Sequence, residues 1–128
     1  MLRVSCAIIF DGGKVFAAQR GPGMHHPMKW EFPGGKVEPG ETEEECIKRE
    51  LAEELQMNIH ILTRLPSFYH TYPDFSIELI PFLCQLLEGG HTALEHNSTG
   101  WFSLPELLTL DWAEADKALM KYVVRNML

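Results

Sequence analysis

The chain has 128 residues, of which 45% are hydrophobic and 10% aromatic, with a formal net charge of −7 and an isoelectric point near 5.3. This length and composition suit one globular domain, so we expect a single domain over residues 1–128 and exclude the disordered and fibrous classes. The acidic balance argues against a basic face for a nucleic acid polymer, so local cations or metal ions must meet any anionic ligand.

Membrane segments and disulfides are not expected either. The chain enters a strand-like run directly and has no apolar stretch near the ~18 residues of a membrane span. We therefore expect a cytoplasmic protein with no signal peptide and no membrane partner. The cysteines are odd in number and scattered, which predicts reduced thiols, and the six histidines lack zinc-site spacing.

The first third of the chain predicts a hairpin followed by a loop. The runs Val4–Phe10 and Lys14–Gln19 flank Asp11-Gly12-Gly13, which has the composition of a tight turn. The Gly- and Pro-rich segment Gly21–Lys29 then predicts a mobile loop that forms a lid or rim. Trp30–Phe32 is short and extended.

A helix is predicted next. Thr42-x-x-Glu45 forms a capping box, and acidic residues in the first turn suit the positive end of a helix dipole, so we place the helix at Glu43–Leu55. The following strands are expected at the runs Ile59–Leu65, Ser67–Tyr72 and Ser76–Leu87, with a turn at Tyr72-Pro73-Asp74.

The C-terminal part predicts two more helices. Gly100–Leu108 (GWFSLPELL) predicts a short strand that leads into a short helix. The last helix is expected from Asp111, where Asp111-x-x-Glu114 has the spacing of another capping box. The order of strands and helices predicts an α/β fold in which helices cover both faces of a mixed sheet.

The stretch from Gly34 to Leu55 contains eight glutamates, out of 18 acidic residues in the whole chain. On a helix, Glu50, Glu53 and Glu54 project from one side, where carboxylates about 5 to 6 Å apart repel one another. Divalent cations could offset this repulsion, because Mg²⁺ prefers oxygen ligands. A solvated face balanced by the basic residues at positions 48 and 49 would also offset it, and the spacing leaves both explanations open.

A longer pattern spans the same stretch. It reads Gly35, five residues, Glu41, seven residues, and then Arg49-Glu50-Leu51-x-Glu53-Glu54. This pattern resembles the signature of the Nudix hydrolases position for position. Gln56 departs from it, because the family usually has a glycine there that ends the helix in a left-handed conformation.

The whole chain is similar to the MutT-type members of that family, which are small nucleoside triphosphate pyrophosphohydrolases. The resemblance implies the Nudix fold, an α/β/α sandwich with a mixed β-sheet. It also implies that Mg²⁺, with Mn²⁺ as a possible substitute, is the cofactor. The groups implied as metal ligands are the carboxylates of Glu50, Glu53 and Glu54, the backbone carbonyl of Gly34 and, with substrate bound, Glu95.

The catalytic roles implied by the resemblance fall on a few of these residues. Either Glu53 or Glu95 is the hydrolytic base, and the sequence does not choose between them. Arg49 can pair with Glu53 and with Glu45 and so fix the orientation of the carboxylates. The pair Gly34-Gly35 leaves the backbone bare, so that a metal or phosphate can approach closely.

Further matches imply a substrate site. Arg20 is expected to contact the substrate phosphates, and Phe32 to line the nucleotide pocket. Asp74 belongs to a turn beside that pocket. Asp116 is expected to read the base, because an ionised carboxylate accepts hydrogen bonds from an exocyclic amino group and a protonated one can also donate.

The implied reaction is attack of water on the β-phosphorus of a nucleoside triphosphate, which releases the monophosphate and pyrophosphate. With 8-oxo-dGTP as substrate the enzyme would cleanse the nucleotide pool and limit mutation. With CTP or methylated dCTP as substrate it would be a CTP-type pyrophosphohydrolase. Two other classes remain open, a non-catalytic Nudix-fold nucleotide sensor and an interaction module that uses its acidic helix, and the chain could be a monomer or a homodimer.

Overall fold

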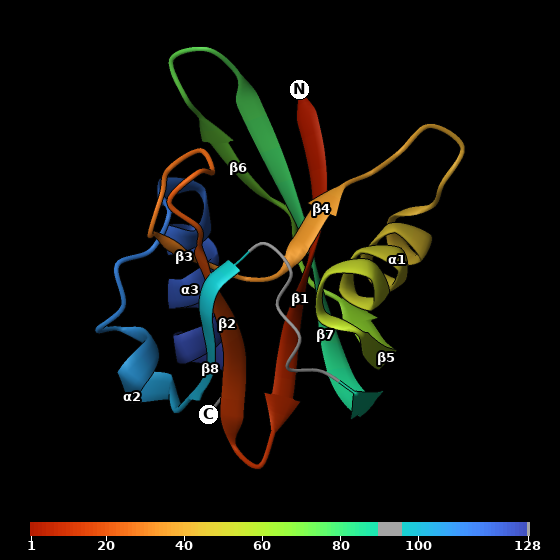
Figure 1. The fold of residues 1–128 in the computed structure, drawn as a ribbon, viewed down its shortest axis with the longest axis vertical. Coiled ribbons are helices and arrows are strands. Elements are labelled where there is room, and N and C mark those ends of the chain that lie inside the picture. The colour runs from red at the N-terminus through yellow and green to blue at the C-terminus, as the bar shows by residue number, and fades with distance from the viewer. Residues whose placement is uncertain (90–95, 128) are drawn as a thin grey trace.

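The computed structural model describes residues 1–89 and 96–127 (Figure 1). In this part of the chain there are eight strands and three helices. The strands are β1 (Leu2–Asp11), β2 (Lys14–Arg20), β3 (Trp30–Glu31), β4 (Gly34–Lys36), β5 (Met57–Arg64), β6 (Phe68–Thr71), β7 (Ser76–Gly89) and β8 (His96–Phe102). The helices are α1 (Glu43–Leu55), α2 (Leu104–Leu107) and α3 (Glu114–Asn126).

The strands form one mixed sheet. The main path runs β3-β2-β1-β7-β5, while β4 pairs with β1, β6 with β7 and β8 with β2. The central pair, β1 and β7, is parallel over nine residue pairs, and the other pairings are antiparallel. A parallel pair cannot be joined by a tight turn, and the chain runs from β1 through β2, β3, β4, α1, β5 and β6 before it returns as β7.

Helices cover both faces of the sheet. Figure 1 shows α1 on one side and α2 with α3 on the other. Alternate residues of β1 serve the two faces, because side chains alternate along a strand: Cys6 and Ile8 pack with the α3 core, and Ala7 and Ile9 with the α1 core. The predicted α/β/α sandwich with a mixed sheet is therefore confirmed.

Local sequence signals account for the first hairpin and for α1. Gly12 and Gly13 have φ values of 59° and 79°, which a glycine turn between β1 and β2 readily accepts. The Thr42 side chain accepts a hydrogen bond from the backbone N–H of Glu45, and the Glu45 carboxylate accepts one from Thr42. The predicted capping box and the predicted bounds of α1 are thus confirmed.

The capping box predicted at Asp111 is wrong. Helix α3 begins at Glu114 behind Ala113, whose side chain makes no capping hydrogen bond. Asp111 is used differently: both of its carboxylate oxygens accept from Lys29 Nζ, at 2.9 and 2.8 Å, and its backbone carbonyl accepts from the N–H of Trp30 at 2.8 Å. The Asp111 side chain therefore forms an ion pair with Lys29 and does not cap the helix.

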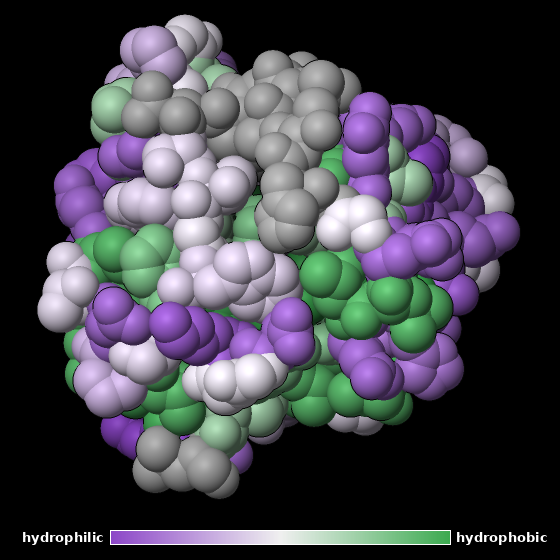
Figure 2. All heavy atoms as spheres, turned by 60° about the horizontal axis from the view of Figure 1, so that its bottom comes forward, coloured by the Kyte–Doolittle hydropathy of each residue, from purple (hydrophilic) through white to green (hydrophobic). Residues whose placement is uncertain are grey.

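Strand β4 was also not expected from the sequence, because Gly34–Lys36 has no β-forming residue pattern. Its pairing with β1 places the glycine pair beside α1. On the face seen in Figure 2, hydrophilic side chains gather on the side where Figure 1 places α1. Within the described residues, none of the helices has the length and apolarity of a membrane span.

Candidate active site

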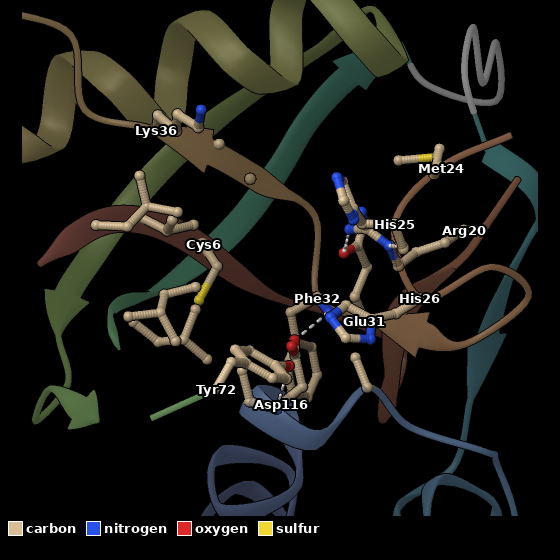
Figure 3. A pocket seen from close by; sticks show the side chains of 18 of the residues that line it. Cys6, Arg20, Met24, His25, His26, Glu31, Phe32, Lys36, Tyr72 and Asp116 are labelled. Carbon is tan, nitrogen blue, oxygen red and sulfur yellow. Dashed lines mark hydrogen bonds and ion pairs between the residues drawn. The ribbon is translucent and has the colours of Figure 1, made fainter. Parts of the chain in front are cut away.

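A cavity of about 530 Å³ lies on the α3 side of the sheet and extends past β4 to α1. Its lining comes from segments far apart in the chain, including β1, the end of β2, β4, β7 and the start of α3. Lys36 of β4 lies toward α1 in Figure 3, whereas Asp116 lies at the opposite end, over α3. Glu54 lines the cavity from α1. The cavity therefore joins the acidic helix face to the residue predicted to read a base.

Arg49 is the centre of the charge arrangement on α1. Its guanidinium binds both oxygens of Glu41, at 2.7 and 2.9 Å, and also contacts Glu50 at 3.0 Å and Glu53 at 3.3 Å. The hydrogen bonds from Arg49 lower the pKa of Glu41 to about 2. One guanidinium thus offsets much of the repulsion among three of the carboxylates.

The predicted pairing of Arg49 with Glu53 is confirmed, and that with Glu45 is wrong. Glu45 is occupied by the capping box, and Glu41 takes the place beside Arg49. Glu41 precedes the helix, so the contact depends on the path of the turn between β4 and α1. Helical spacing alone could not have predicted it.

A side chain at either of the two glycines of β4 would clash, but with different groups. A Cβ added at Gly34 would lie 2.0 Å from the backbone oxygen of Ser5 in β1, so close strand packing requires that glycine. A Cβ at Gly35 would lie 2.2 Å from the carboxyl carbon of Glu50. The bare backbone of Gly35 therefore makes room for the Glu50 carboxylate against the strand.

Arg20 lies in the wall of the cavity, at the end of β2. Its guanidinium forms an ion pair with Glu31 at 2.6 Å and donates a second hydrogen bond to the backbone carbonyl of His25. Glu31 was not among the residues predicted for the site. Its position follows from the pairing of β2 with β3, in which Ala18 faces Glu31, and no local sequence pattern indicates that register.

Asp116 is 6% exposed at the other end of the cavity. Its Oδ2 accepts a hydrogen bond from the backbone N–H of Phe32 at 3.0 Å (Figure 3). Burial raises the pKa of Asp116 to about 8, and the negative charge of Glu31 adds to the effect. The carboxyl is therefore mostly protonated near neutral pH, so it can donate as well as accept a hydrogen bond.

The other predicted site residues are placed as follows. Phe32 is buried, lines the cavity and packs against Trp112 with ring centroids 4.7 Å apart. Tyr72 lines the cavity, but Asp74 is exposed in the turn beyond it and is not part of the lining. Glu95, predicted as a metal ligand and possible base, lies outside the described residues.

The acidic residues on α1 have the chemistry that a hard divalent cation requires. Carboxylate oxygens of Glu50, Glu53 and Glu54 and backbone oxygens of the glycine pair are the preferred ligands of such ions. Glu50 fits closely over Gly35, where a side chain would fill the space. Among residues 1–89 and 96–127, however, no three His, Cys, Asp or Glu side chains are gathered tightly enough to form a ready-made metal cage.

The fold, the cavity and the signature helix define a class of protein. Residues 1–123 match the family model described as the NUDIX domain, and the chain belongs to the Nudix hydrolase family. It is similar to the 8-oxo-dGTP diphosphatase of Escherichia coli K12, with 30% identity over 125 residues that cover 97% of each chain. It is also similar to the CTP pyrophosphohydrolase of the same organism, with 34% identity over 121 residues that cover 94% of this chain and 90% of the relative.

A solved structure supports the same assignment. The MutT protein of methicillin-resistant Staphylococcus aureus 252, described as a DNA mismatch repair protein of the Nudix hydrolase family, is 35% identical to this chain. The two superimpose with a TM-score of 0.77 over 97% of this chain and 95% of the other. The family resemblance predicted from the Gly35–Glu54 pattern is confirmed.

Proposed function

We propose that this enzyme hydrolyses nucleoside triphosphates to the monophosphate and pyrophosphate, with 8-oxo-dGTP as the preferred substrate. The names of its relatives support this reaction class. The observation that carries the proposal is the cavity, which runs from Glu54 on the signature helix α1 to the buried Asp116 at α3. This arrangement suits a ligand with a polyphosphate at one end and a base at the other.

Charge neutralisation is the main requirement at the polyphosphate end. We assign the metal ligands to Glu50, Glu53, Glu54 and the backbone carbonyl of Gly34, with Mg²⁺ as the ion and Mn²⁺ as a substitute, and include Glu95 once substrate is bound. When bound, such an ion neutralises phosphate oxygens and lowers the pKa of water. Arg49 holds the oxygens of Glu50 and Glu53 in place, and we assign Arg20, beside its partner Glu31 in the cavity wall, to contact the substrate phosphates.

The hydrolytic base is assigned to Glu53 or Glu95. Glu53 is the more accessible of the carboxylates that Arg49 binds, with 61% of its side chain exposed, so it can reach water without leaving the helix face. The base takes a proton from water, and the water oxygen attacks the β-phosphorus. The bond from that phosphorus to the oxygen shared with the α-phosphorus breaks, so the nucleoside monophosphate is the leaving group, and the pyrophosphate product carries the oxygen of the water.

The base end suits a base that offers both a hydrogen-bond acceptor and a donor to Asp116. A protonated Asp116 both donates and accepts, which an oxidised guanine satisfies through a ring N–H or an amino group together with a carbonyl. A cytosine offers an amino group beside a ring nitrogen that accepts, and this also fits. The CTP pyrophosphohydrolase relative supports CTP or methylated dCTP as the alternative substrate.

Hydrolysis is tested by incubating the purified protein with a panel of ordinary, oxidised and methylated nucleoside triphosphates, with Mg²⁺ and with EDTA. Chromatographic separation of the products distinguishes monophosphate plus pyrophosphate from diphosphate plus phosphate. Glu53→Gln and Glu54→Gln should each lower kcat/KM at least about 100-fold. Glu44→Gln is the matched control, because Glu44 is an exposed glutamate in the first turn of the same helix.

The result also separates the other classes of function. A protein that binds nucleotide but hydrolyses none of the panel would be a sensor of the Nudix fold. If the protein neither binds nor hydrolyses nucleotide, the enzyme proposal is wrong, and an interaction module is the class of function that remains.

Base recognition is tested with Asp116→Asn. In the variant the amide oxygen accepts from the N–H of Phe32, so the group left for the ligand is an NH2, which donates but cannot accept or ionise. We expect the ratio of kcat/KM for 8-oxo-dGTP to that for CTP to change by at least about tenfold, since one lost hydrogen bond in a buried site changes discrimination by that order. An unchanged ratio would show that Asp116 does not read the base.

A further inference from the structure

The loop of residues 21–29, between β2 and β3, forms one wall of the cavity. Met24, His25 and His26 of this loop belong to the lining. Its backbone is tied to β2, because the N–H of Met28 donates to the carbonyl of Arg20 at 2.9 Å. The carbonyl of Met28 accepts in turn from the side-chain amide of Gln19 at 3.0 Å.

The loop backbone adopts an unfavourable conformation at two residues. His26 and Met28 have φ values of 50° and 65°, in the left-handed region that side chains other than glycine disfavour. Within the described residues, Gln56 is the one other non-glycine residue with a positive φ. Such a conformation persists only where surrounding contacts hold it, so specific contacts must hold this loop.

His26 makes a specific contact across the cavity. Its imidazole stacks on the ring of Tyr72, with centroids 4.7 Å apart and planes 26° apart, and both rings lie near Asp116 in Figure 3. The loop therefore contacts the opposite wall of the cavity through the stack of His26 on Tyr72. Aromatic contacts of this kind contribute beyond the area they bury.

Tyr72 is itself held in place. Its hydroxyl oxygen accepts a hydrogen bond from the N–H of Ala115 at 3.1 Å, one residue before Asp116. The ring of His70 packs edge-on against it at 4.5 Å. The stack thus joins the loop to a fixed point at the end of the cavity where the base is proposed to bind.

We propose that His26 is a positioning residue that latches the loop of residues 21–29 over bound nucleotide by stacking on Tyr72. The cavity measures about 530 Å³ with the stack in place, so the latched loop leaves room for a ligand. This inference rests on the proposed nucleotide hydrolysis. The stack lies beside Asp116, at the opposite end of the cavity from Lys36, so we expect it to act on substrate retention and not on bond cleavage.

Steady-state kinetics with 8-oxo-dGTP and with CTP tests the latch. His26→Ala removes the ring and should raise KM about 3- to 10-fold while kcat stays within about twofold. His26→Phe restores a planar ring and should return KM to within about twofold of the original. His60→Ala is the control, because His60 is an exposed histidine on β5 outside the cavity lining.

An unchanged KM in His26→Ala would overturn the proposal, and so would a fall in kcat at unchanged KM. Equal defects in His26→Ala and His26→Phe would overturn it as well, since the stacked ring would then not be the cause.

Amide hydrogen exchange gives a second readout that needs no hydrolysis. In His26→Ala without nucleotide, the Met28 amide should exchange about 3- to 10-fold faster, while amides in the β1–β7 pair keep their protection and show that the fold is intact. If no nucleotide is hydrolysed but this acceleration is seen, the proposed function fails and the latch stands as a property of the loop. If the Met28 amide exchanges at the same rate in both proteins, the latch itself is wrong.

Discussion

Single residues explain how this chain tolerates crowded glutamates. Arg49 binds Glu41, Glu50 and Glu53 simultaneously, so the acidic face carries its own counter-charge. The two explanations that the sequence left open are therefore not exclusive. A fixed guanidinium reduces the repulsion and orients the carboxylates, while Glu54 faces the cavity.

The adjacent glycines of β4 give the sharpest contrast at this scale. Gly35→Ala should push the Glu50 carboxylate away, because that flexible group is what a Cβ meets at 2.2 Å. We expect kcat/KM to fall at least about tenfold with a loss of less than about 1 kcal/mol in unfolding free energy. Gly34→Ala meets the backbone of Ser5 at 2.0 Å and should cost more than about 2 kcal/mol.

Denaturant unfolding and the nucleotide assay, applied to both alanine variants, check this contrast. Equal losses of stability in the two variants would contradict the different roles assigned to the glycines.

Asp116 should make stability depend on pH. Its carboxyl has a pKa of about 8 in the folded protein, against 3.8 for an ordinary aspartate, so between these values the unfolded chain releases a proton that the folded chain retains. The favourable contribution is complete below pH 3.8 and is lost as the pH rises toward 8, by up to about 1.4 kcal/mol per pH unit.

Asp116→Asn removes this titration. From pH 5 to pH 8, the unfolding free energy of the variant relative to the original protein should therefore rise by about 2 to 4 kcal/mol. Urea denaturation across this range measures the difference. Parallel stability curves would show that the carboxyl is ionised in the folded protein throughout.

At the scale of whole elements, α1 begins and ends by different means. The capping box of Thr42 and Glu45 satisfies backbone groups at the start. At the other end Gln56 adopts φ 53° and ψ 36°, the left-handed conformation that a family glycine would supply, and its N–H donates to the carbonyl of Leu51. Replacing the glycine has therefore not moved the end of the helix, but glutamine adopts this conformation at a cost.

Gln56→Gly should remove that cost and raise the unfolding free energy by about 0.5 to 1 kcal/mol. Ala52→Gly, at an exposed position inside the same helix, should lower it by about 1 kcal/mol, because glycine is unfavourable in a helix interior. Thermal unfolding of the pair compares the same new residue in two backbone conformations. Destabilisation by both would mean that the left-handed conformation of Gln56 is not a source of strain.

At the scale of the whole molecule, the cavity lies where the two halves of the site meet. Helix α1 covers one face of the sheet and α3 the other, and the space past β4 brings Glu54 and Asp116 into one cavity. A ligand that spans both ends therefore binds the folded state alone. Such binding stabilises the protein through mass action.

Millimolar Mg²⁺ with a non-hydrolysable nucleoside triphosphate analogue should thus raise the melting temperature. At a concentration about 100 times Kd, the gain in unfolding free energy is about 2.7 kcal/mol. The Glu53→Gln and Glu54→Gln double variant should lose most of the gain, and EDTA should abolish it in the original protein. Differential scanning calorimetry measures both effects. If the rise in melting temperature remained in the presence of EDTA, binding of the phosphates would not depend on a metal ion.

The sequence alone determined most of the elements and the class of chemistry, but not strand β4 or the start of α3. Caps, turn glycines and strand-like runs are local signals, so the first hairpin and α1 could be placed from them, and the pattern from Gly35 to Glu54 identified the family. Asp116, Arg20 and Phe32 were predicted from the resemblance, and they line one cavity.

Only the tertiary structure decided which partners these residues have. Arg49 binds Glu41 and not the predicted Glu45. Asp111 pairs with Lys29 and does not cap α3. His26, in the loop between β2 and β3, stacks on Tyr72. Each of these pairs joins segments whose separation depends on turn paths and strand register. No local pattern encodes such distances, because they result from packing both faces of the sheet at once.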